Sequence, residues 1–156
     1  MAINNSLNTM TDFETRQRKS IIFLLRPKAS LSFLEEDSTI RQGLEKIKFH
    51  GYTALPVISE SGKYVGTINE GDFLWFILST KNFDIKKQEK YFIKDIIRKD
   101  WNPAVKIETT MDELVPRIME QNFVPVIDDR GFFMGIITRK DVIENYYNLA
   151  NASCNK

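Results

Sequence analysis

The residues with the clearest chemical potential are four consecutive ones near the C-terminal end, Thr138, Arg139, Lys140 and Asp141. Together they bring a hydroxyl group, two positive charges and a carboxylate into one short stretch. A hydroxyl group and cations beside the free N–H groups of a helix N-terminus are suited to an anion such as a phosphate. The stretch is therefore suited to an anion, provided that a helix begins there.

The flanking residues predict that helix. Gly135 precedes the β-branched pair Ile136 and Ile137, which favours an extended strand. Thr138 is a good N-cap residue, and Asp141, three positions later, gives the spacing of a capping box, with Asp in place of the usual Glu or Gln. A strand is thus expected to lead directly into a helix. For this stretch alone, a plain helix cap explains the residues as well as an anion site does.

The same stretch occurs twice, which is the strongest feature of the sequence. Residues 56–72 align with residues 125–141, and the identical pairs are Pro56/Pro125, Val57/Val126, Ile58/Ile127, Gly62/Gly131, Gly66/Gly135, Ile68/Ile137 and Asp72/Asp141. Each copy predicts a β-hairpin followed by a capped helix. Upstream, Thr39 with Gln42 and Thr110 with Glu113 have capping-box spacing and open amphipathic helices. We therefore expect two strand–helix–strand–strand–helix units.

The repeat also predicts how the chain is divided. We expect a polar N-terminal segment with a lead-in helix at 1–20, a first repeat at 21–80, a charged connector at 81–91, a second repeat at 92–148 and a tail at 149–156. The lead-in helix would open at Thr11, and the sequence at 26–28 would form a turn around Pro27. The second repeat has lost two residues before Pro125, and Pro116 is expected to bend its first helix.

This pattern resembles the CBS domain, and its two copies resemble a CBS pair, or Bateman module, over roughly residues 21–147. The family signature is a Pro-Val pair followed by Gly, two apolar residues, Thr or Ser, two variable residues and Asp. Residues 135–141 match it at every position, whereas Asn69 replaces the hydroxyl residue in the first repeat. The resemblance implies a mixed α/β (α+β) fold with pseudo-twofold symmetry, like that of small stand-alone bacterial CBS-pair proteins. It also implies that the N-terminal lead-in packs against the other repeat.

The resemblance further implies a ligand site, because CBS pairs bind adenosine-containing ligands in clefts between their repeats. Asp141 would bind the ribose and Thr138 the phosphate. Phe123, Pro125 and Ala104 would enclose the base, and Arg139, Lys140, Arg98 and Lys99 would supply positive charge. A second, weaker cleft would contain Asn69, Asp72, Tyr52 and Pro56. Glu70 stands where the second repeat has Arg139, so electrostatics favour the Asp141 cleft for a phosphate.

Composition excludes several other classes of protein. With 156 residues, 42% of them hydrophobic, the chain can bury a sizeable core. A formal net charge of +1 argues against a nucleic-acid-binding protein. No apolar run approaches the roughly 20 residues that a membrane-spanning helix needs, and the N-terminus lacks the plan of a signal peptide. We expect a cytoplasmic protein that binds neither nucleic acid nor membrane.

Few residues could perform catalysis. His50 is the only histidine and Cys154 the only cysteine, which leaves no plausible nucleophile–base pair and no zinc-binding spacing. There is no glycine-rich phosphate loop either. We therefore expect a protein that is not an enzyme and has no metal site.

The leading hypothesis is a regulatory module that senses an adenine nucleotide and signals to a protein partner, working as a homodimer. Phe73, Trp75 and Phe76 would be exposed at the dimer surface. The ligand remains open among AMP, ADP, ATP, S-adenosylmethionine and cyclic di-AMP; small CBS-pair proteins of Gram-positive bacteria that bind cyclic di-AMP are similar in length. The alternative is a ligand-free protein-interaction module, which Asn69 and the shortened second repeat support.

Overall fold

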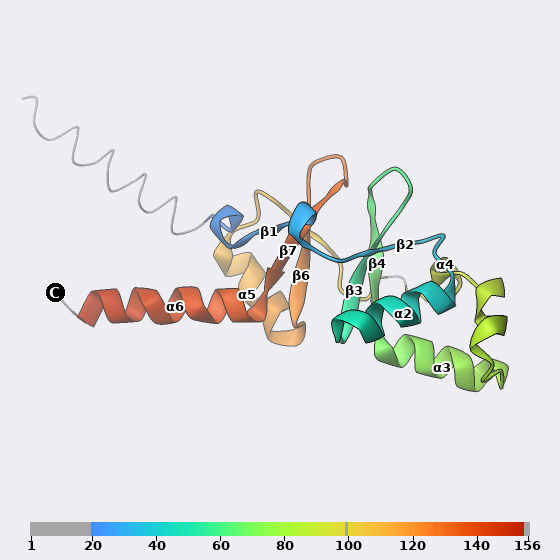
Figure 1. Ribbon diagram of the computed structural model, residues 1–156. Helices are drawn as coiled ribbons and strands as arrows, with labels where there is room; N and C mark the ends of the chain where they lie inside the picture. The colour runs from blue at the N-terminus through green and yellow to red at the C-terminus, as the bar shows by residue number, and fades with distance from the viewer. Residues whose placement is uncertain (1–19, 99, 155–156) are drawn as a thin grey trace, which may run out of the picture.

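Two similar halves make up the protein, each a small sheet with helices beside it (Figure 1). The computed structural model describes residues 20–98 and 100–154. The first half consists of β2 (Leu34–Glu35), α2 (Ile40–His50), β3 (Ala54–Ile58), β4 (Tyr64–Asn69) and α3 (Glu70–Thr80). The second consists of β5 (Val105–Lys106), α5 (Met111–Glu120), β6 (Phe123–Ile127), β7 (Phe133–Thr138) and α6 (Arg139–Cys154). The predicted strand–helix–strand–strand–helix order is confirmed in both repeats.

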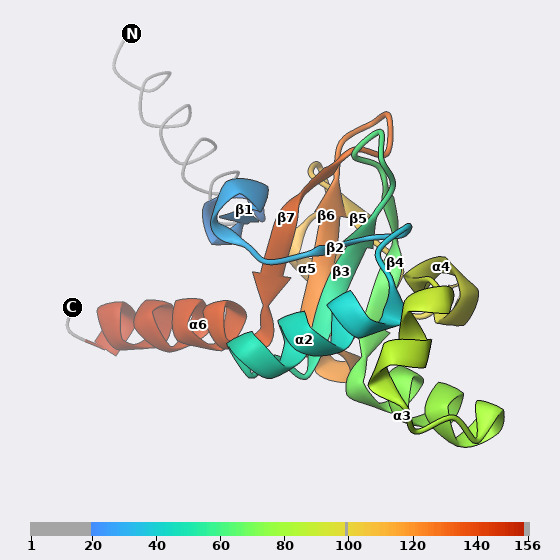
Figure 2. The same cartoon turned by 45° about the vertical axis from the view of Figure 1, so that its right-hand side comes forward.

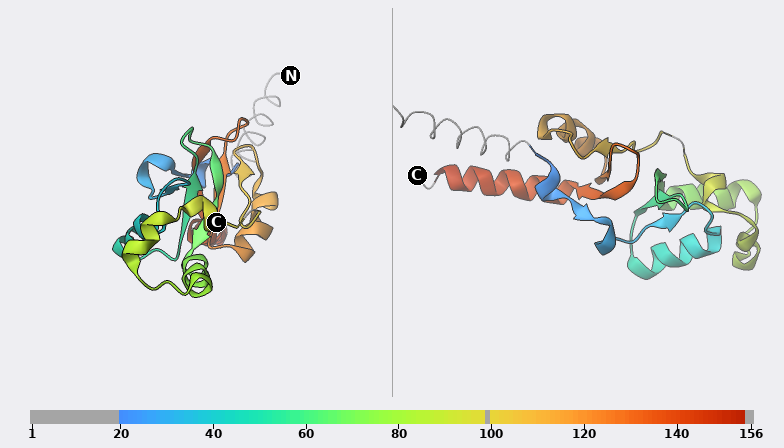
Figure 3. Two further views of the ribbon diagram at one scale, coloured as in Figure 1. Left: turned by 90° about the vertical axis from the view of Figure 1, so that its right-hand side faces the viewer. Right: turned by 90° about the horizontal axis from the view of Figure 1, so that it is seen from above.

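The two sheets have equivalent pairings. In the first sheet β2 runs parallel to β3 and β3 antiparallel to β4, and in the second β5, β6 and β7 repeat this arrangement. The turns of the two hairpins touch, because the Tyr64 N–H donates to the Gly131 carbonyl and the Phe133 N–H donates to the Gly62 carbonyl. Figure 3 shows α2 and α5 on opposite sides of the paired sheets, as a pseudo-twofold arrangement requires.

The prediction of a turn at residues 26–28 is wrong. Arg26 and Pro27 form strand β1 (Arg26–Pro27), which pairs antiparallel with β7 at Ile136 and Gly135. Glycine is needed for this approach, since a Cβ atom at position 135 would lie 2.0 Å from the Arg26 carbonyl oxygen. The chain changes direction only afterwards, in the 3-10 helix η2 (Lys28–Ser30).

The capping boxes form as predicted, and Asn69 serves as well as a hydroxyl residue. At the start of α2 the Gln42 N–H donates to Thr39 Oγ1 at 3.2 Å, and the Thr39 N–H donates to Gln42 Oε1 at 2.9 Å. At the start of α3 the Asp72 N–H donates to Asn69 Oδ1 at 3.0 Å, and the Asn69 N–H donates to Asp72 Oδ2 at 2.9 Å. The loss of the hydroxyl residue from the first repeat therefore does not cost that repeat its helix cap.

Each lead-in packs into the core of the other repeat, although the resemblance implied this only for the N-terminal one. Ile21, just before the 3-10 helix η1 (Ile22–Leu24), is fully buried in the core of the second repeat. Ile93, which opens α4 (Ile93–Ile96), is fully buried in the core of the first. The predicted lead-in helix from Thr11 lies outside the described residues. The connector contains the 3-10 helix η3 (Ile85–Lys90), which packs on α2 with Gln88 buried, so it is not purely a solvated link.

The ends of the helices differ between the repeats. Helix α2 spans 11 residues and is capped by Gly51 with a φ of 65°, whereas α5 spans 10 residues, includes Pro116 and is followed by Gln121 in extended geometry. Helix α6 continues to Cys154, so most of the predicted tail is helical, and its second half extends beyond the rest of the molecule (Figure 2).

Phe73 was predicted to be exposed and is instead 2% exposed, because it fills the core of the first repeat. Trp75 is 67% exposed and Phe76 is half-buried. The other large apolar residues that are exposed on the described parts of α3 and α6 are Leu74, Leu78, Ile143, Tyr146, Tyr147 and Leu149.

Candidate functional site

Two clefts lie between the repeats, on either side of the point where β3 and β6 begin. We name them after the helix N-cap residue that each contains, Thr138 or Asn69. The Thr138 cleft has a volume of about 260 Å³, and the residues that line it alone are Arg26, Leu31, Ser32, Tyr52, Leu55, Pro56, Ile136 and Thr138. The Asn69 cleft has a volume of about 420 Å³, and its own residues are Thr67, Asn69, Glu70, Gly71, Trp101, Asn102, Glu120 and Gln121. Thr53, Ala54, Asn122 and Phe123 border both clefts.

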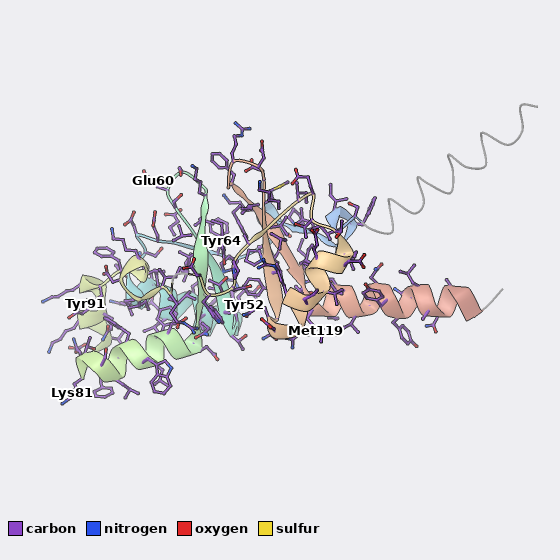
Figure 4. The ribbon with its side chains drawn as sticks, turned by 180° about the vertical axis from the view of Figure 1, so that it is seen from behind. Tyr52, Glu60, Tyr64, Lys81, Tyr91 and Met119 are labelled. Carbon is purple, nitrogen blue, oxygen red and sulfur yellow. The ribbon has the colours of Figure 1, made fainter. Side chains whose placement is uncertain are left out.

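Each cleft combines residues of both repeats. The N-cap residue comes from one repeat, and the wall opposite comes from the segment between helix and strand in the other. The structure therefore brings Tyr52 and Pro56 to the Thr138 cleft, not to the Asn69 cleft where we expected them. Figure 4 shows Tyr52 in the region between the two halves.

Of the three residues expected to enclose the base, only Phe123 lines the Thr138 cleft. Phe123 borders both clefts, since it pairs with Thr138 just as Ala54 pairs with Asn69. Pro125 is buried on β6 and Ala104 is half-buried before β5, and neither lines either of these two clefts.

The predicted cations do not converge on Thr138. The guanidinium of Arg139 donates to the carbonyls of Ile118 at 2.9 Å and Met119 at 3.2 Å, at the end of α5. Lys140 is exposed and lies 3.6 Å from the Glu144 carboxylate. Lys99 lies outside the described residues. Arg98 pairs with Asp72 of the first repeat and lines neither cleft.

The cation that the structure places at the Thr138 cleft is Arg26. Its Nε donates to Asp141 Oδ2 at 2.8 Å and its Nη2 donates to Asp141 Oδ1 at 2.7 Å. Thr138 Oγ1 also donates to Asp141 Oδ2, at 2.5 Å, and accepts the Asp141 N–H at 3.1 Å. The guanidinium of Arg26 holds the pKa of the Asp141 carboxyl group below its usual value, and the Thr138 hydroxyl lowers it further.

An equivalent pair lies in the other repeat. Arg98 Nε lies 2.7 Å from Asp72 Oδ1. The side chains of Arg26 and Arg98 are both 48% exposed, whereas those of Asp141 and Asp72 are 17% and 5% exposed. Arg98 also stacks on the Trp101 ring, with 4.2 Å from its guanidinium carbon to the ring centroid.

Sequence reasoning missed Arg26, although a signal was present. Leu24-Leu25-Arg26 and Ile96-Ile97-Arg98 are two copies of an apolar pair followed by arginine, one before each repeat's first strand. Both copies lie against a signature glycine: Leu25 and the Arg26 carbonyl against Gly135, and Ile97 against Gly66.

The interior of the Asn69 cleft is the more polar of the two. The Tyr64 hydroxyl group donates to the Asn102 carbonyl at 2.8 Å and lies 2.8 Å from Thr67 Oγ1, and the Asn102 amide donates to the Phe123 carbonyl at 3.1 Å. Burial raises the pKa of Tyr64. In the Thr138 cleft, Ile136 takes the position of Thr67, so its interior is more apolar.

The clefts also differ in charge. Glu70 and Glu120 line the Asn69 cleft, whereas the charged residue lining the Thr138 cleft is Arg26. A negatively charged ligand is therefore favoured in the Thr138 cleft. This agrees with the expectation drawn from Glu70, although Arg26 supplies the charge that we had assigned to other residues.

His50 lies beside the Thr138 cleft. Its ring stacks on Tyr52 at a centroid distance of 5.2 Å, and its Nε2 lies 3.3 Å from Ser32 Oγ. Among residues 20–98 and 100–154, no three His, Cys, Asp or Glu side chains lie close enough to hold a metal ion. Within the same part of the chain, none of the helices has the length and apolar character to cross a membrane.

Comparison with known proteins identifies the repeats. The family model of the CBS domain matches residues 27–79 and 93–148. A solved structure of CbpB in complex with c-di-AMP is similar in fold, with a TM-score of 0.82 and 22% identity over 94% of this chain and 96% of that one. A CBS domain protein from Streptococcus pneumoniae has a TM-score of 0.78 and 24% identity, covering 91% of this chain and 96% of its own. CBSX2 in complex with AMP has a TM-score of 0.69 and 21% identity, covering 85% and 98%.

Two curated relatives match over less than half of their own length. An inosine-5'-monophosphate dehydrogenase of Nitrosopumilus maritimus is 27% identical over 123 residues, which are 79% of this chain and 24% of the dehydrogenase. An uncharacterised protein of Methanopyrus kandleri is 24% identical over 103 residues, 64% of this chain and 49% of that protein. The chain thus spans about a quarter and about half of the length of these relatives.

Proposed function

Since this chain belongs to the CBS-domain family, we propose that it is a regulatory module that binds an adenine nucleotide in the Thr138 cleft and signals its presence to a protein partner. The observation that carries this proposal is the make-up of that cleft: an apolar interior, two aromatic side chains and one guanidinium. Tyr52 offers its ring to a base, Thr138 a hydroxyl group, and Arg26 a positive charge. A small set of polar groups in a mostly apolar cleft is typical of small-molecule sites.

The charge of the cleft narrows the class of ligand. AMP, ADP, ATP and cyclic di-AMP carry phosphate groups that Arg26 would attract. S-adenosylmethionine carries a positive sulfonium group and no phosphate, so it is less suited to this cleft. Solved structures of similar fold contain c-di-AMP and AMP, which supports a phosphorylated adenine ligand for this chain too.

We also propose that the protein acts in the cytoplasm, as a regulator rather than a catalyst. Its signal would pass through a homodimer. The support for a dimer is the set of exposed apolar side chains on two equivalent helices, with Leu74 and Trp75 on α3 and Ile143 and Tyr147 on α6. Exposed apolar patches of this kind are typical of protein–protein interfaces.

A thermal-shift panel with AMP, ADP, ATP, cyclic di-AMP and S-adenosylmethionine tests the binding. A ligand at 100 times its dissociation constant should add about 2.7 kcal/mol to the free energy of unfolding. Replacement of Tyr52 by alanine should lower this gain by about 1 kcal/mol or more, because stacking of a base on an aromatic ring contributes about 1–3 kcal/mol. The matched control is Trp101→Ala, which removes an aromatic ring from the Asn69 cleft alone and should leave the gain intact. If Trp101→Ala loses the ligand-induced stabilisation and Tyr52→Ala keeps it, the ligand binds in the Asn69 cleft instead.

A ligand-free protein-interaction module is the second candidate. It is favoured because Arg26 and Arg98 already form ion pairs with the two signature carboxylates, Asp141 and Asp72. These carboxylates are therefore not free to bind a ligand. It predicts that no nucleotide at millimolar concentration raises the melting temperature.

A further inference from the structure

We propose that Arg26 is the phosphate-binding residue of the Thr138 cleft, and that Asp141 holds the Arg26 guanidinium in place instead of binding ribose. This inference rests on the proposed function, which it deepens by assigning the residue that recognises the anion. It replaces the role that the family resemblance implies for Asp141.

The first argument is the position of the two side chains. Arg26 lines the Thr138 cleft, whereas Asp141 does not. Asp141 instead borders a second depression, which it lines together with Leu24, Leu25 and Glu144, and Arg26 lines both this depression and the cleft. Arg26 therefore stands between the carboxylate and the cleft, and a ligand in the cleft meets the guanidinium first.

The second argument is the number of acceptors left on Asp141. A carboxylate offers about four lone-pair positions on its two oxygens. Oδ2 already receives Arg26 Nε at 2.8 Å, Thr138 Oγ1 at 2.5 Å and the Thr138 N–H at 3.3 Å. Oδ1 receives Arg26 Nη2 at 2.7 Å. Two vicinal ribose hydroxyl groups need two free acceptors, which this carboxylate lacks while Arg26 is bound.

The third argument is the number of donors left on Arg26. A guanidinium has five N–H donors, and Asp141 receives one from Nε and one from Nη2. The remaining donors of Arg26 have no hydrogen-bond partner among residues 20–98 and 100–154. A planar guanidinium held along one edge presents its other edge for paired hydrogen bonds to phosphate oxygens. Because Asp141 restrains the side chain, less rotamer entropy is lost when the anion binds.

The equivalent pair provides an internal comparison. Arg98 and Asp72 form the same kind of ion pair as Arg26 and Asp141, and the Arg98 side chain is as exposed as that of Arg26. However, neither Arg98 nor Asp72 lines the Asn69 cleft. Arg98 stacks on Trp101 instead, and Glu70 and Glu120 line that cleft. Removal of Arg98 thus removes an Arg–Asp pair without removing an anion site, which makes it the matched control.

The test is isothermal titration of AMP, adenosine and inorganic pyrophosphate into the wild type and the variants Arg26→Ala, Arg26→Lys, Asp141→Asn and Arg98→Ala. Arg26→Ala should weaken AMP binding by about 10- to 100-fold, the factor expected for loss of a charged hydrogen-bond donor, and leave adenosine binding unchanged. Asp141→Asn should weaken AMP binding by a smaller factor and also leave adenosine binding unchanged. Arg26→Lys should recover part of the AMP affinity, and Arg98→Ala should bind all three probes like the wild type.

Several outcomes would overturn the inference. If Asp141→Asn weakens adenosine as much as AMP, then Asp141 binds the ribose. If Arg26→Ala tightens AMP binding, then Arg26 obstructs the cleft and does not bind the phosphate. If the wild type binds no nucleotide, the proposed function fails, and pyrophosphate decides the inference separately. Pyrophosphate binding that Arg26→Ala abolishes would still support an anion site at Arg26, whereas pyrophosphate that does not bind, or that binds Arg26→Ala equally well, would contradict it. Melting curves of each variant show that it is folded.

Discussion

At the scale of single residues, the pair of Arg26 and Asp141 makes stability depend on pH. The pKa of Asp141 is lower in the folded protein than in the unfolded chain, because Arg26 stabilises the carboxylate. Its contribution to stability is therefore present above the unfolded pKa of about 3.9 and is lost as the pH falls through the folded pKa. The difference in free energy of unfolding between wild type and Asp141→Asn should be constant above about pH 6 and shrink below about pH 4. Urea denaturation across this range measures it, and a difference independent of pH would contradict the ion pair.

Gly135 is a second residue whose role can be tested. A Cβ atom there would lie 2.0 Å from the Arg26 carbonyl oxygen, so Gly135→Ala must separate β1 from β7. The free energy of unfolding should fall by about 1–3 kcal/mol or more, the usual cost of overpacking a core site. Urea denaturation measures this loss. The matched control is Gly66→Ala, where the nearest atom is Ile97 Cδ1 at 2.8 Å, the end of a side chain that can move. Equal losses in the two variants would mean that the backbone contact is not the cause.

At the scale of elements, the two clefts depend on helix N-termini that are capped differently. Thr138 caps α6 and Asn69 caps α3, each with an aspartate three residues later. Thr138→Ala should cost about 1 kcal/mol of stability, as the loss of an N-cap usually does. Thr138→Asn should be nearly neutral, because asparagine already caps α3. Thermal and urea unfolding of both variants check this, and an unchanged stability in Thr138→Ala would show that the hydroxyl group does not cap α6.

Helices α3 and α6 are also where the proposed dimer can be tested. Trp75→Asp and Ile143→Asp place a charge on exposed apolar surface, so they should turn a dimer into a monomer with little change in stability. Light scattering after size-exclusion chromatography measures the mass, and Glu60→Ala, at an exposed hairpin turn, is the control. A wild type that is monomeric at high micromolar concentration would contradict the dimer.

At the scale of the whole molecule, the crossed lead-ins make the two repeats fold as one unit. Ile21 belongs to the core of the second repeat and Ile93 to the core of the first. Ile21→Ala and Ile93→Ala should each cost about 2–5 kcal/mol, typical of large-to-small changes in a core. Each should also leave a single unfolding transition, followed by circular dichroism and by the fluorescence of Trp75 and Trp101. Two separate transitions would show that the repeats are independent.

How far the sequence predicted this arrangement depends on the range of the interactions. The helix caps at Thr39, Thr110 and Thr138 and the two hairpins involve residues close in the chain, so repeated local patterns revealed them. Strand β1 has two residues and contains Pro27, so it leaves no alternating pattern to detect.

The site was harder to predict than the fold, since its partners are far apart in sequence. Arg26 and Asp141 are separated by 115 positions, and each cleft draws its two walls from different repeats. Tyr52 was accordingly grouped with the signature residues of its own repeat, although it faces Thr138. A pattern within one repeat cannot show which side chains the pseudo-twofold arrangement brings together.

The most direct test of a nucleotide sensor follows methyl signals by NMR during titration with AMP, ATP and cyclic di-AMP. Ile136 lines the Thr138 cleft and Thr67 lines the Asn69 cleft, so their methyl groups report the two clefts separately. Binding in the Thr138 cleft predicts that at least one of these nucleotides shifts the Ile136 signal, saturably and at lower concentration than any change at Thr67. Shifts confined to Thr67, or no shift at either residue with millimolar nucleotide, would contradict it.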